Sequence, residues 1–320
     1  MQLRFRQLGV FPSPFEPPAA AAVWACVDET ADTWLGALLN ASLLEYDARA
    51  GEYSLHDLAR LFAEKLILQD TKQAMAALEG YAGYYLQQGS AADDEYLKGS
   101  EHILPALACF RHLWVHLQTA YERLRTESKT GWPHPASADE WLNTFPGQTI
   151  YLLDLYLTPR QRLPLLSEAL EAARRINDKQ SQGVHLGNMG LAWADLGEAR
   201  KAIEFYEQRL IIAREIGDRR GEGNALGNMG LAWADLGEAR KAIEFYEQQL
   251  VIAREIGDRR GEAIGAWNLG LTYEKQGEYA RACELMKIRV TYEREIRHSD
   301  AELHEQKMKE ICARARQAGK

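Results

Sequence analysis

The chain has 320 residues, 46% of them hydrophobic and 26% charged, which is the balance of a globular protein rather than a disordered one. No apolar run approaches the roughly 18 residues of a membrane span, and no signal-peptide core follows the basic start, so we expect a cytoplasmic protein with no membrane partner. The net charge of −8 arises within residues 1–145, which hold 11 Lys and Arg against 19 Asp and Glu, whereas residues 146–320 hold 27 of each. Neither part has the basic excess that favours a nucleic-acid partner.

The four cysteines are widely separated, and none forms a Cys-x-x-Cys pair. This spacing predicts reduced thiols, with neither a disulfide framework nor a zinc knuckle. The cysteines are Cys26, Cys109, Cys283 and Cys312.

Residues 1–70 predict a small module of helices around one β-hairpin. Two prolines lead into an apolar helix, Asp28 is placed to cap a second one, and His56 and Asp57 open another. Helices followed by a hairpin and a further helix are the element order of a winged-helix module. The expected elements are helices at 16–27, 28–39 and 56–69 and strands at 43–46 and 52–55.

Residues 71–145 predict a helical connector that ends in a linker at 129–143, where prolines and small polar residues gather. The linker's Trp132 and Trp141 suggest that it packs against the protein.

Within this connector, His112 and His116 have the i, i+4 spacing of a helical zinc site, with His102 nearby. The glutamate of an H-E-x-x-H sequence is absent. We therefore predict no metal and interpret the histidines as side chains on the flank of a helix.

An internal repeat dominates the second half of the chain. Residues 187–226 and 227–266 are identical at 34 of 40 positions, and a diverged copy begins at Trp267. When the sequence is compared with itself 40 residues earlier, a further copy is found that starts near Gly147. In the repeat at 187–226 the apolar residues recur at helical spacing on either side of a Leu-Gly-Glu break. Each repeat is therefore predicted to form two helices. Such hairpins must stack to bury their apolar faces.

The small residues Gly190 and Ala202 mark where the two helices of the repeat at 187–226 approach each other closely. After the repeats, apolar residues on an otherwise charged stretch at 300–316 predict a capping helix.

The sequence thus predicts an all-α chain with one β-hairpin, a solenoid preceded by a small winged-helix domain. Its parts are a winged-helix domain at 1–70, a helical connector and linker at 71–145, four helical hairpins at 146–299 that start near 147, 187, 227 and 267, and a capping helix at 300–320.

The repeated GNMGLAWADLGEARKAIEFYEQ resembles the tetratricopeptide repeat of the long-helix, 40-residue subtype, which occurs in kinesin light chains and bacterial sensor proteins. The resemblance implies that the first helix of each hairpin lines a concave face, where a ladder of asparagines binds an extended peptide. A carboxamide both donates and accepts, so it pairs with main-chain amides of any sequence. The alternative is that each asparagine caps or ties neighbouring helices. The implied ligand-binding residues are Gln148, Asn188, Asn228, Asn268, Leu191, Leu231, Leu271, Asp195, Asp235 and Lys275.

Residues 1–70 resemble the winged helix of the signal-transduction ATPases with numerous domains, the STAND class that includes NB-ARC proteins. The resemblance rests on Leu-Gly-Val-Phe-Pro at 8–12, Ser-Leu-Leu-Glu-Tyr at 42–46 and Leu-His-Asp at 55–57. It implies that His56 senses bound ADP and that Asp57 supports it. No G-x-x-x-x-G-K-[ST] sequence occurs, so we expect no cofactor unless an ATPase core joins in cis or in trans. Without that core, His56 is a helix N-terminal residue with no ligand.

These features predict a non-enzymatic sensor region of a bacterial signal-transduction ATPase, either its C-terminal part or the product of a split gene. The repeats would bind a protein or peptide, and the winged helix would relay occupancy to the core. One alternative is a free-standing scaffold. Another is a DNA-binding regulator, although a recognition helix at 28–39 would carry acids and no base. Near-identical repeats can also stack between chains, so self-association is a further expectation.

Overall fold

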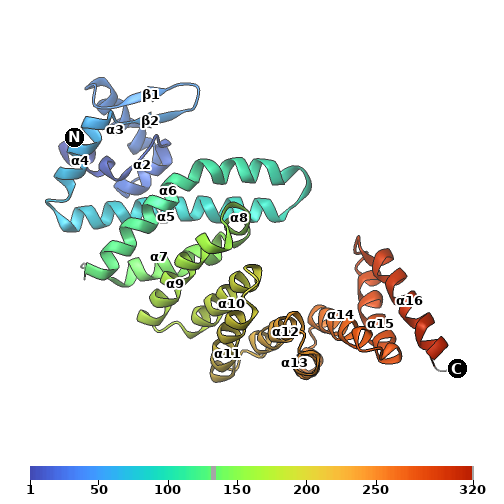
Figure 1. Cartoon of the computed structure of the whole chain (residues 1–320). Helices are drawn as coiled ribbons and strands as arrows, with labels where there is room; N and C mark the ends of the chain where they lie inside the picture. Colours follow the sequence, from blue (N-terminus) through green and yellow to red (C-terminus); the bar gives the residue numbers. More distant parts are fainter. Residues whose placement is uncertain (131–134, 319–320) are drawn as a thin grey trace. The chain divides into compact units, whose positions relative to one another are not determined.

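The computed structural model describes residues 1–130 and 135–318. These residues form two compact units, the first made of Met1–Thr158 with Glu171–Ile176 and the second of Pro159–Leu170 with Asn177–Lys320. As predicted, the described residues are almost entirely helical, with one two-stranded sheet (Figure 1). None of the helices in the described ranges combines the length and the hydropathy that a membrane-spanning segment requires.

The first unit begins with short elements around the sheet and continues with long helices. Its elements are α1 (Gln2–Gln7), η1 (Leu8–Val10), α2 (Pro17–Trp24), α3 (Asp28–Asn40), β1 (Glu45–Asp47), β2 (Glu52–Ser54), α4 (Asp57–Ile67), α5 (Thr71–Leu97), η2 (Ser100–His102), α6 (Ile103–Thr130), α7 (Pro135–Gln148) and α8 (Ile150–Tyr156).

Aromatic rings form the core that joins the N-terminal segment to α5 and α6. Phe11 stacks on Phe15, and Tyr85 of α5 stacks on His116 of α6, each pair with ring centroids 4.0 Å apart. Tyr81 meets Phe11 edge-on, and all five side chains are fully buried. Each such contact adds about 0.5–1.5 kcal/mol beyond its buried area. The cluster therefore fixes the long helices against the segment that precedes α2.

The β-hairpin lies where the sequence places it, with strands of three residues each. β1 pairs antiparallel with β2, with Glu45 opposite Ser54. Phe15 forms an additional bridge to Tyr53, with N–H···O bonds of 2.9 Å in both directions. The segment before α2 is therefore a second pairing partner of β2.

One detail of this module differs from expectation. Asp28 is the first residue of α3 and makes no capping hydrogen bond, because the extended residue at the N-cap position is Val27. Its carboxylate still lies in the first turn, where the helix dipole favours negative charge. As expected, His56 and Asp57 open a helix, since α4 begins at Asp57 with His56 as its N-cap.

The linker prediction at 129–143 was wrong for residues 129–130 and 135–143, which are helical, while residues 131–134 lie outside the described residues. α6 continues to Thr130 and α7 starts at Pro135. A proline in the first helical turn removes no hydrogen bond, since the N–H groups there have no intrahelical acceptor. Composition alone does not separate such a helix start from a loop.

Of the two linker tryptophans, Trp141 is buried, and its indole N–H donates to the carbonyl oxygen of Ala82 at 2.8 Å. The expectation that this tryptophan packs against the protein is confirmed. Trp132 lies outside the described residues.

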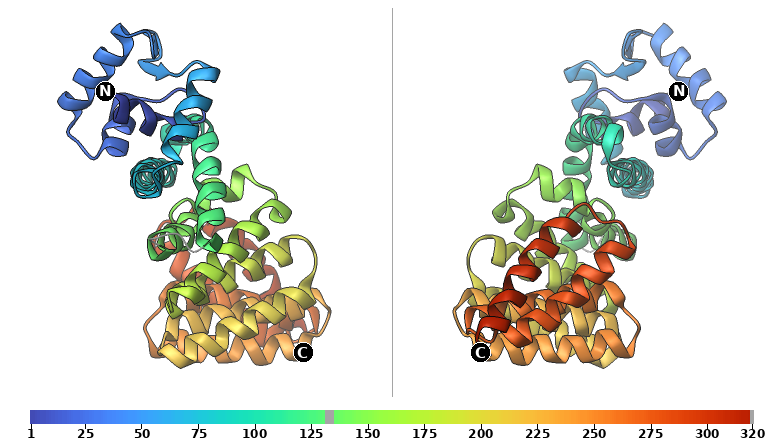
Figure 2. Two further views of the ribbon diagram at one scale, coloured as in Figure 1. Left: turned by 90° about the vertical axis from the view of Figure 1, so that its left-hand side faces the viewer. Right: turned by 90° about the vertical axis from the view of Figure 1, so that its right-hand side faces the viewer.

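The second unit is a stack of helical hairpins. Its elements are α9 (Pro159–Arg175), which is divided between the two units, α10 (Lys179–Asp195), α11 (Ala199–Ile216), α12 (Arg219–Asp235), α13 (Ala239–Glu255), α14 (Arg259–Lys275), α15 (Tyr279–Glu295) and α16 (Ala301–Ala318). From α10 to α16 each helix packs against the next, as the yellow to red ribbons of Figure 2 show.

The close helix approach predicted at Gly190 is present. A Cβ on Gly190 would lie 2.3 Å from a ring carbon of Tyr206, and one on Gly230 would lie 2.7 Å from the ring of Tyr246. Both tyrosines are fully buried. The ring of the second helix therefore packs directly on the backbone of the first, a contact that any larger residue would obstruct.

The hairpin ends also repeat. Gly217 ends α11 with φ of +72°, a left-handed conformation that favours glycine, and the Asp218 carboxylate then accepts a hydrogen bond from the N–H of Gly221 at the start of α12. Asp258 and Gly261 repeat this cap at α14. The turn that stops one helix thus starts the next.

The helical hairpin expected to start near Gly147 differs in structure from the later hairpins. Its first helix, α8, has only seven residues and belongs to the first compact unit. The carboxylate of Asp93 in α5 accepts a 2.8 Å hydrogen bond from the N–H of Leu152 and so caps α8. α8 is therefore bonded to α5.

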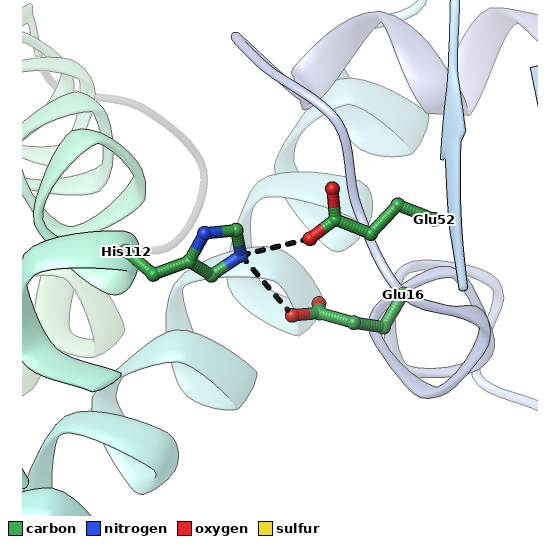
Figure 3. A group of neighbouring side chains, drawn as sticks. All are labelled: Glu16, Glu52 and His112. Atoms are coloured by element: carbon green, nitrogen blue, oxygen red, sulfur yellow. Dashed lines mark ion pairs between the residues drawn. The ribbon is translucent and has the colours of Figure 1, made fainter. Parts of the chain in front are cut away.

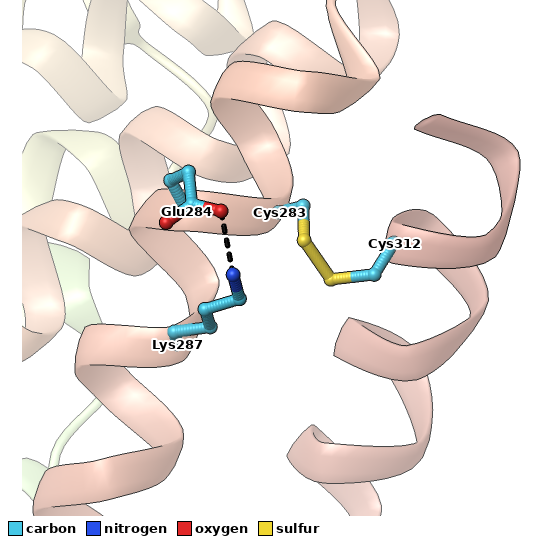
Figure 4. Close-up of a disulfide and its surroundings, with 4 residues drawn as sticks. All are labelled: Cys283, Glu284, Lys287 and Cys312. Carbon is cyan, nitrogen blue, oxygen red and sulfur yellow. Dashed lines mark hydrogen bonds and ion pairs between the residues drawn. A yellow bond between two sulfur atoms is a disulfide. The ribbon is translucent and has the colours of Figure 1, made fainter. Parts of the chain in front are cut away.

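Cys283 of α15 and Cys312 of α16 form a disulfide (Figure 4), which corrects the prediction of reduced thiols. Their Cα atoms are 5.0 Å apart although 29 residues separate them in sequence. Only the packing of α16 on α15 brings them together, so spacing gave no signal. Cys26 and Cys109 are free thiols.

Candidate functional site

The first helices of the hairpins, α10, α12 and α14, form the inner side of the stack. α10 contacts α12 and α12 contacts α14, whereas no comparable contact joins α11 to α13 or α13 to α15 among the described residues. A stack curves towards the helices that approach each other. The inner face is therefore made by the first helices, where the resemblance to tetratricopeptide repeats places a concave binding surface.

Asn188, Asn228 and Asn268, here called the asparagine ladder, occupy the same position of α10, α12 and α14. All three are half-buried. Within residues 1–130 and 135–318, none of their carboxamides has a hydrogen-bond partner. The alternative, that each asparagine ties neighbouring helices together, therefore has no bond to support it, and the amide groups are open to a ligand.

The leucines that follow the ladder by three residues lie on the same helix face. Leu191 is 43% exposed and Leu231 47%, while Leu271 is half-buried. Exposed leucines at a regular interval offer apolar contacts beside the carboxamides.

Seven residues after each asparagine the charge changes along the stack. Asp195, Asp235 and Lys275 are all exposed. Asp195 accepts a 2.8 Å hydrogen bond from Arg162 of α9, which partly neutralises it. Along the inner face, the charge therefore changes from Asp195, which is paired with an arginine, to Asp235, which is unpaired within the described residues, and then to the basic Lys275.

Gln148 does not continue the ladder in the way the repeat register implies. It is the exposed last residue of α7, and α8 starts two residues later. It borders a hollow on α5 within the first compact unit. The early end of α7 places it at a helix terminus instead of inside the first helix of a hairpin.

A groove of about 600 Å³ lined by α13, α14 and α15 was missed by the sequence reasoning. Tyr273 and Leu285 stand where the preceding hairpin has the larger Trp233 and Phe245, so alignment of the repeats contained the signal. The groove lining is Glu247, Leu250, Val251, Arg254, Leu269, Tyr273, Ala280, Arg281, Glu284 and Leu285.

In the first unit, His56 is exposed at the N-terminus of α4, where its Nδ1 accepts a long 3.4 Å hydrogen bond from the N–H of Leu58. Asp57 is also exposed and pairs with Arg60 at 3.4 Å. The two side chains lie at the surface with local contacts only among the described residues.

The three histidines considered for a metal site do not converge. His116 is buried in the aromatic cluster, and His102 pairs with Glu95. His112 is half-exposed and faces two glutamates from the N-terminal module. The i, i+4 histidine pair is therefore not a site in itself.

Residues 221–287 match the family model of the tetratricopeptide repeat. A search among curated protein sequences finds no significant match. Residues 221–287 thus carry the tetratricopeptide repeat, a protein-interaction module that typically serves as a non-catalytic scaffold.

Two solved structures share the helical-repeat fold at low identity. The apo form of RapI is 13% identical, with a TM-score of 0.55 over 89% of this chain and 70% of its own. BtubC from P. vanneervenii is 18% identical, with a TM-score of 0.51 over 61% of this chain and 82% of its own. These likenesses establish the fold alone.

A third structure is a signal-transduction ATPase with numerous domains from Pyrococcus horikoshii that has a tetratricopeptide repeat sensor. It is 19% identical over 95% of this chain, and this chain spans 53% of its length. With a TM-score of 0.41, it supports no structural argument.

Proposed function

We propose that the second unit binds an extended segment of a protein partner along its inner face, and that this recognition is the activity of the chain. The observation that carries the proposal is the asparagine ladder, three carboxamides at one helical position with no partner among the described residues. The amide atoms of this regular row are reachable by solvent, so the main chain of a ligand can form hydrogen bonds with them.

The recognition would rest mainly on main-chain contacts. Each carboxamide offers a donor and an acceptor to the peptide backbone, and the exposed leucines contact apolar side chains between the rungs. Asp235 and Lys275 favour a basic residue near α12 and an acidic residue near α14. The ligand class is therefore an extended peptide of mixed charge.

A second part of the proposal concerns the first unit. Its Leu55-His56-Asp57 sequence resembles the nucleotide-sensing sequence of STAND ATPases, and the exposure of His56 leaves its ring accessible to another domain. We propose that the module at 1–70 is a winged helix that passes occupancy of the repeats to an ATPase core, as part of a cytoplasmic protein. Such a relay requires the peptide to bind the two states of the assembly with different affinity.

The peptide site is tested with the triple variant Asn188→Ala/Asn228→Ala/Asn268→Ala against a phage-displayed library of random linear peptides. Each lost hydrogen bond contributes about 1 kcal/mol, so the variant should bind selected peptides roughly 100-fold more weakly. Circular dichroism establishes first that the variant is folded.

The matched control is Gln208→Ala/Gln248→Ala, which removes exposed carboxamides from the second helices at the same 40-residue interval. It should bind like the wild type. A peptide that the triple variant retains at full affinity would contradict the ladder and direct attention to the groove between α13 and α15.

The relay is tested separately, by adding an ATPase core of the STAND class and measuring peptide affinity with ADP and with ATP. A nucleotide effect that His56→Ala removes supports the relay. Equal affinity in both nucleotides would favour a free-standing scaffold, and salt-dependent DNA binding by the chain would favour a DNA-binding regulator.

A further inference from the structure

Three side chains from distant parts of the first unit converge at one point (Figure 3). Glu16 precedes α2, Glu52 begins β2, and His112 lies in α6. The Nε2 atom of His112 is 3.0 Å from a carboxylate oxygen of Glu52 and 3.6 Å from one of Glu16. All three candidate ligand atoms lie within 4.8 Å of one another.

The backbone holds these residues in place. The paired hydrogen bonds between Phe15 and Tyr53 fix the neighbouring Glu16 and Glu52 side by side. One turn after His112, the buried His116 places its Nε2 3.1 Å from the carbonyl oxygen of Pro14 and so anchors α6 to the same segment. The arrangement is therefore built by long-range contacts of the core instead of by mobile surface side chains.

The negative charge of the cluster is poorly compensated. Among the described residues, no Lys or Arg forms an ion pair with Glu16 or Glu52. The Oε2 atom of Glu16 is buried without a hydrogen-bond partner there. Pro17 and Pro18 follow it, so the start of α2 supplies no N–H at these positions.

We propose that Glu16, Glu52 and His112 form a site for a divalent transition-metal ion of the Zn²⁺ type. Tetrahedral zinc with ligand bonds of about 2.0–2.2 Å separates its ligand atoms by about 3.3–3.6 Å, a range that the 3.0 and 3.6 Å distances nearly match. Imidazole nitrogen suits zinc, whereas magnesium and calcium prefer oxygen ligands. His112 is 49% exposed, so water completes the coordination.

Bound metal would join α2, β2 and α6 at one point. Because the unfolded chain does not hold the three ligands together, metal binding stabilises the folded first unit. This site is independent of peptide binding by the second unit.

The test uses the full chain freed of metal with EDTA. Zinc sulfate is added while binding is followed by calorimetry and unfolding by temperature, with magnesium chloride in a parallel titration. We expect zinc, and not magnesium, to raise the unfolding midpoint. Glu52→Gln and His112→Ala should each weaken zinc binding by more than about tenfold, the loss that even an outer-shell substitution causes.

The control is His102→Ala, which removes another half-exposed histidine that pairs with a glutamate near the start of α6. It should bind zinc like the wild type, and cobalt absorption should show tetrahedral coordination in both. Each variant is first shown by circular dichroism to fold without metal. The absence of a zinc effect in the wild type, or an equal zinc affinity in all three variants and the wild type, would overturn the proposal and leave the cluster as an ion pair.

Discussion

His116 is a buried imidazole with hydrogen-bond partners at both ring nitrogens. Its Nε2 lies 3.1 Å from the carbonyl oxygen of Pro14 and 2.9 Å from the Ser13 hydroxyl, and its Nδ1 lies 3.2 Å from the Tyr81 hydroxyl. A carbonyl oxygen only accepts, so Nε2 carries the proton of a neutral ring. A charged ring at this buried position would have to lose its hydration.

This burial predicts acid sensitivity. It lowers the pKa of His116 from 6.5 to about 4. The pKa of His116 is lower in the folded chain than in the unfolded chain, so only the unfolded chain takes up a proton between these two values. The stability that the neutral, buried ring provides is therefore complete above about pH 6.5 and is lost as pH falls towards 4. From pH 7.5 to pH 5 the loss should be about 2 kcal/mol, measured by urea denaturation at both values.

The control is His116→Gln, which keeps a donor and an acceptor but does not titrate. This variant should be less stable at pH 7.5 and should lose less stability on acidification. An identical pH dependence in both proteins would show that other groups cause the acid effect.

Residue-level prediction from sequence succeeded where contacts are local or repeated. Gly190 was identified because its helix stripe and the following stripe must meet, and its contact with Tyr206 bears this out. The Glu16, Glu52 and His112 cluster could not be found in this way. His112 lies 96 positions after Glu16, and only the Phe15–Tyr53 bridge and the burial of His116 bring them together.

At the scale of elements, the hairpins were predictable because two units are nearly identical and each fold signal occurs twice. The structure on either side of these two repeats, where the sequence diverges, was less predictable. At 129–130 and 135–143, the prolines of the segment suggested a linker where the structure has helices. The pairing of Cys283 with Cys312 depends on how α16 docks on α15, which no cysteine spacing encodes.

The disulfide predicts that the capping helix α16 is stabilised by oxidation. It closes a loop between positions 29 residues apart, so its removal should lower the free energy of unfolding by about 3.5 kcal/mol through loop entropy. Cys283→Ser and Cys312→Ser should therefore each unfold at a lower urea concentration than the wild type without reductant.

Reductant provides the matched comparison. It should lower the midpoint of the wild type to that of the serine variants and leave the variants unchanged, while Cys26→Ser/Cys109→Ser should behave as the wild type. Four reactive thiols in the unreduced, urea-unfolded chain would show that the bond does not form.

At the scale of the whole molecule, the second unit behaves as a series of nearest-neighbour contacts. The positions of α11 and α13 that face the preceding hairpin carry the same residues, since Phe205 corresponds to Phe245 and Ile212 to Ile252. The hairpins α10–α11 and α12–α13 therefore offer nearly the same surface to the helices that precede them. Stability in such a stack is close to a sum over units and their interfaces.

Removal of residues 187–226 tests this interchangeability. The deletion joins Leu186 to Gly227 and restores the local sequence Leu-Gly-Asn-Met-Gly. We expect a folded chain that unfolds cooperatively at a lower midpoint, because one hairpin and one interface are lost, and that binds peptide more weakly because Asn188 is removed. Denaturation followed by circular dichroism measures the first effect, and peptide titration the second.

The control deletes residues 198–217, which removes α11 and leaves α10 without its hairpin partner. It should lose cooperative unfolding, although it removes half as many residues. If both deletions fold equally poorly, the hairpins are not interchangeable, and the 40-residue identity reflects duplication of sequence without equivalence of structure. If only the control fails, the hairpin is the unit of folding, and the number of hairpins sets the length of peptide that the inner face holds.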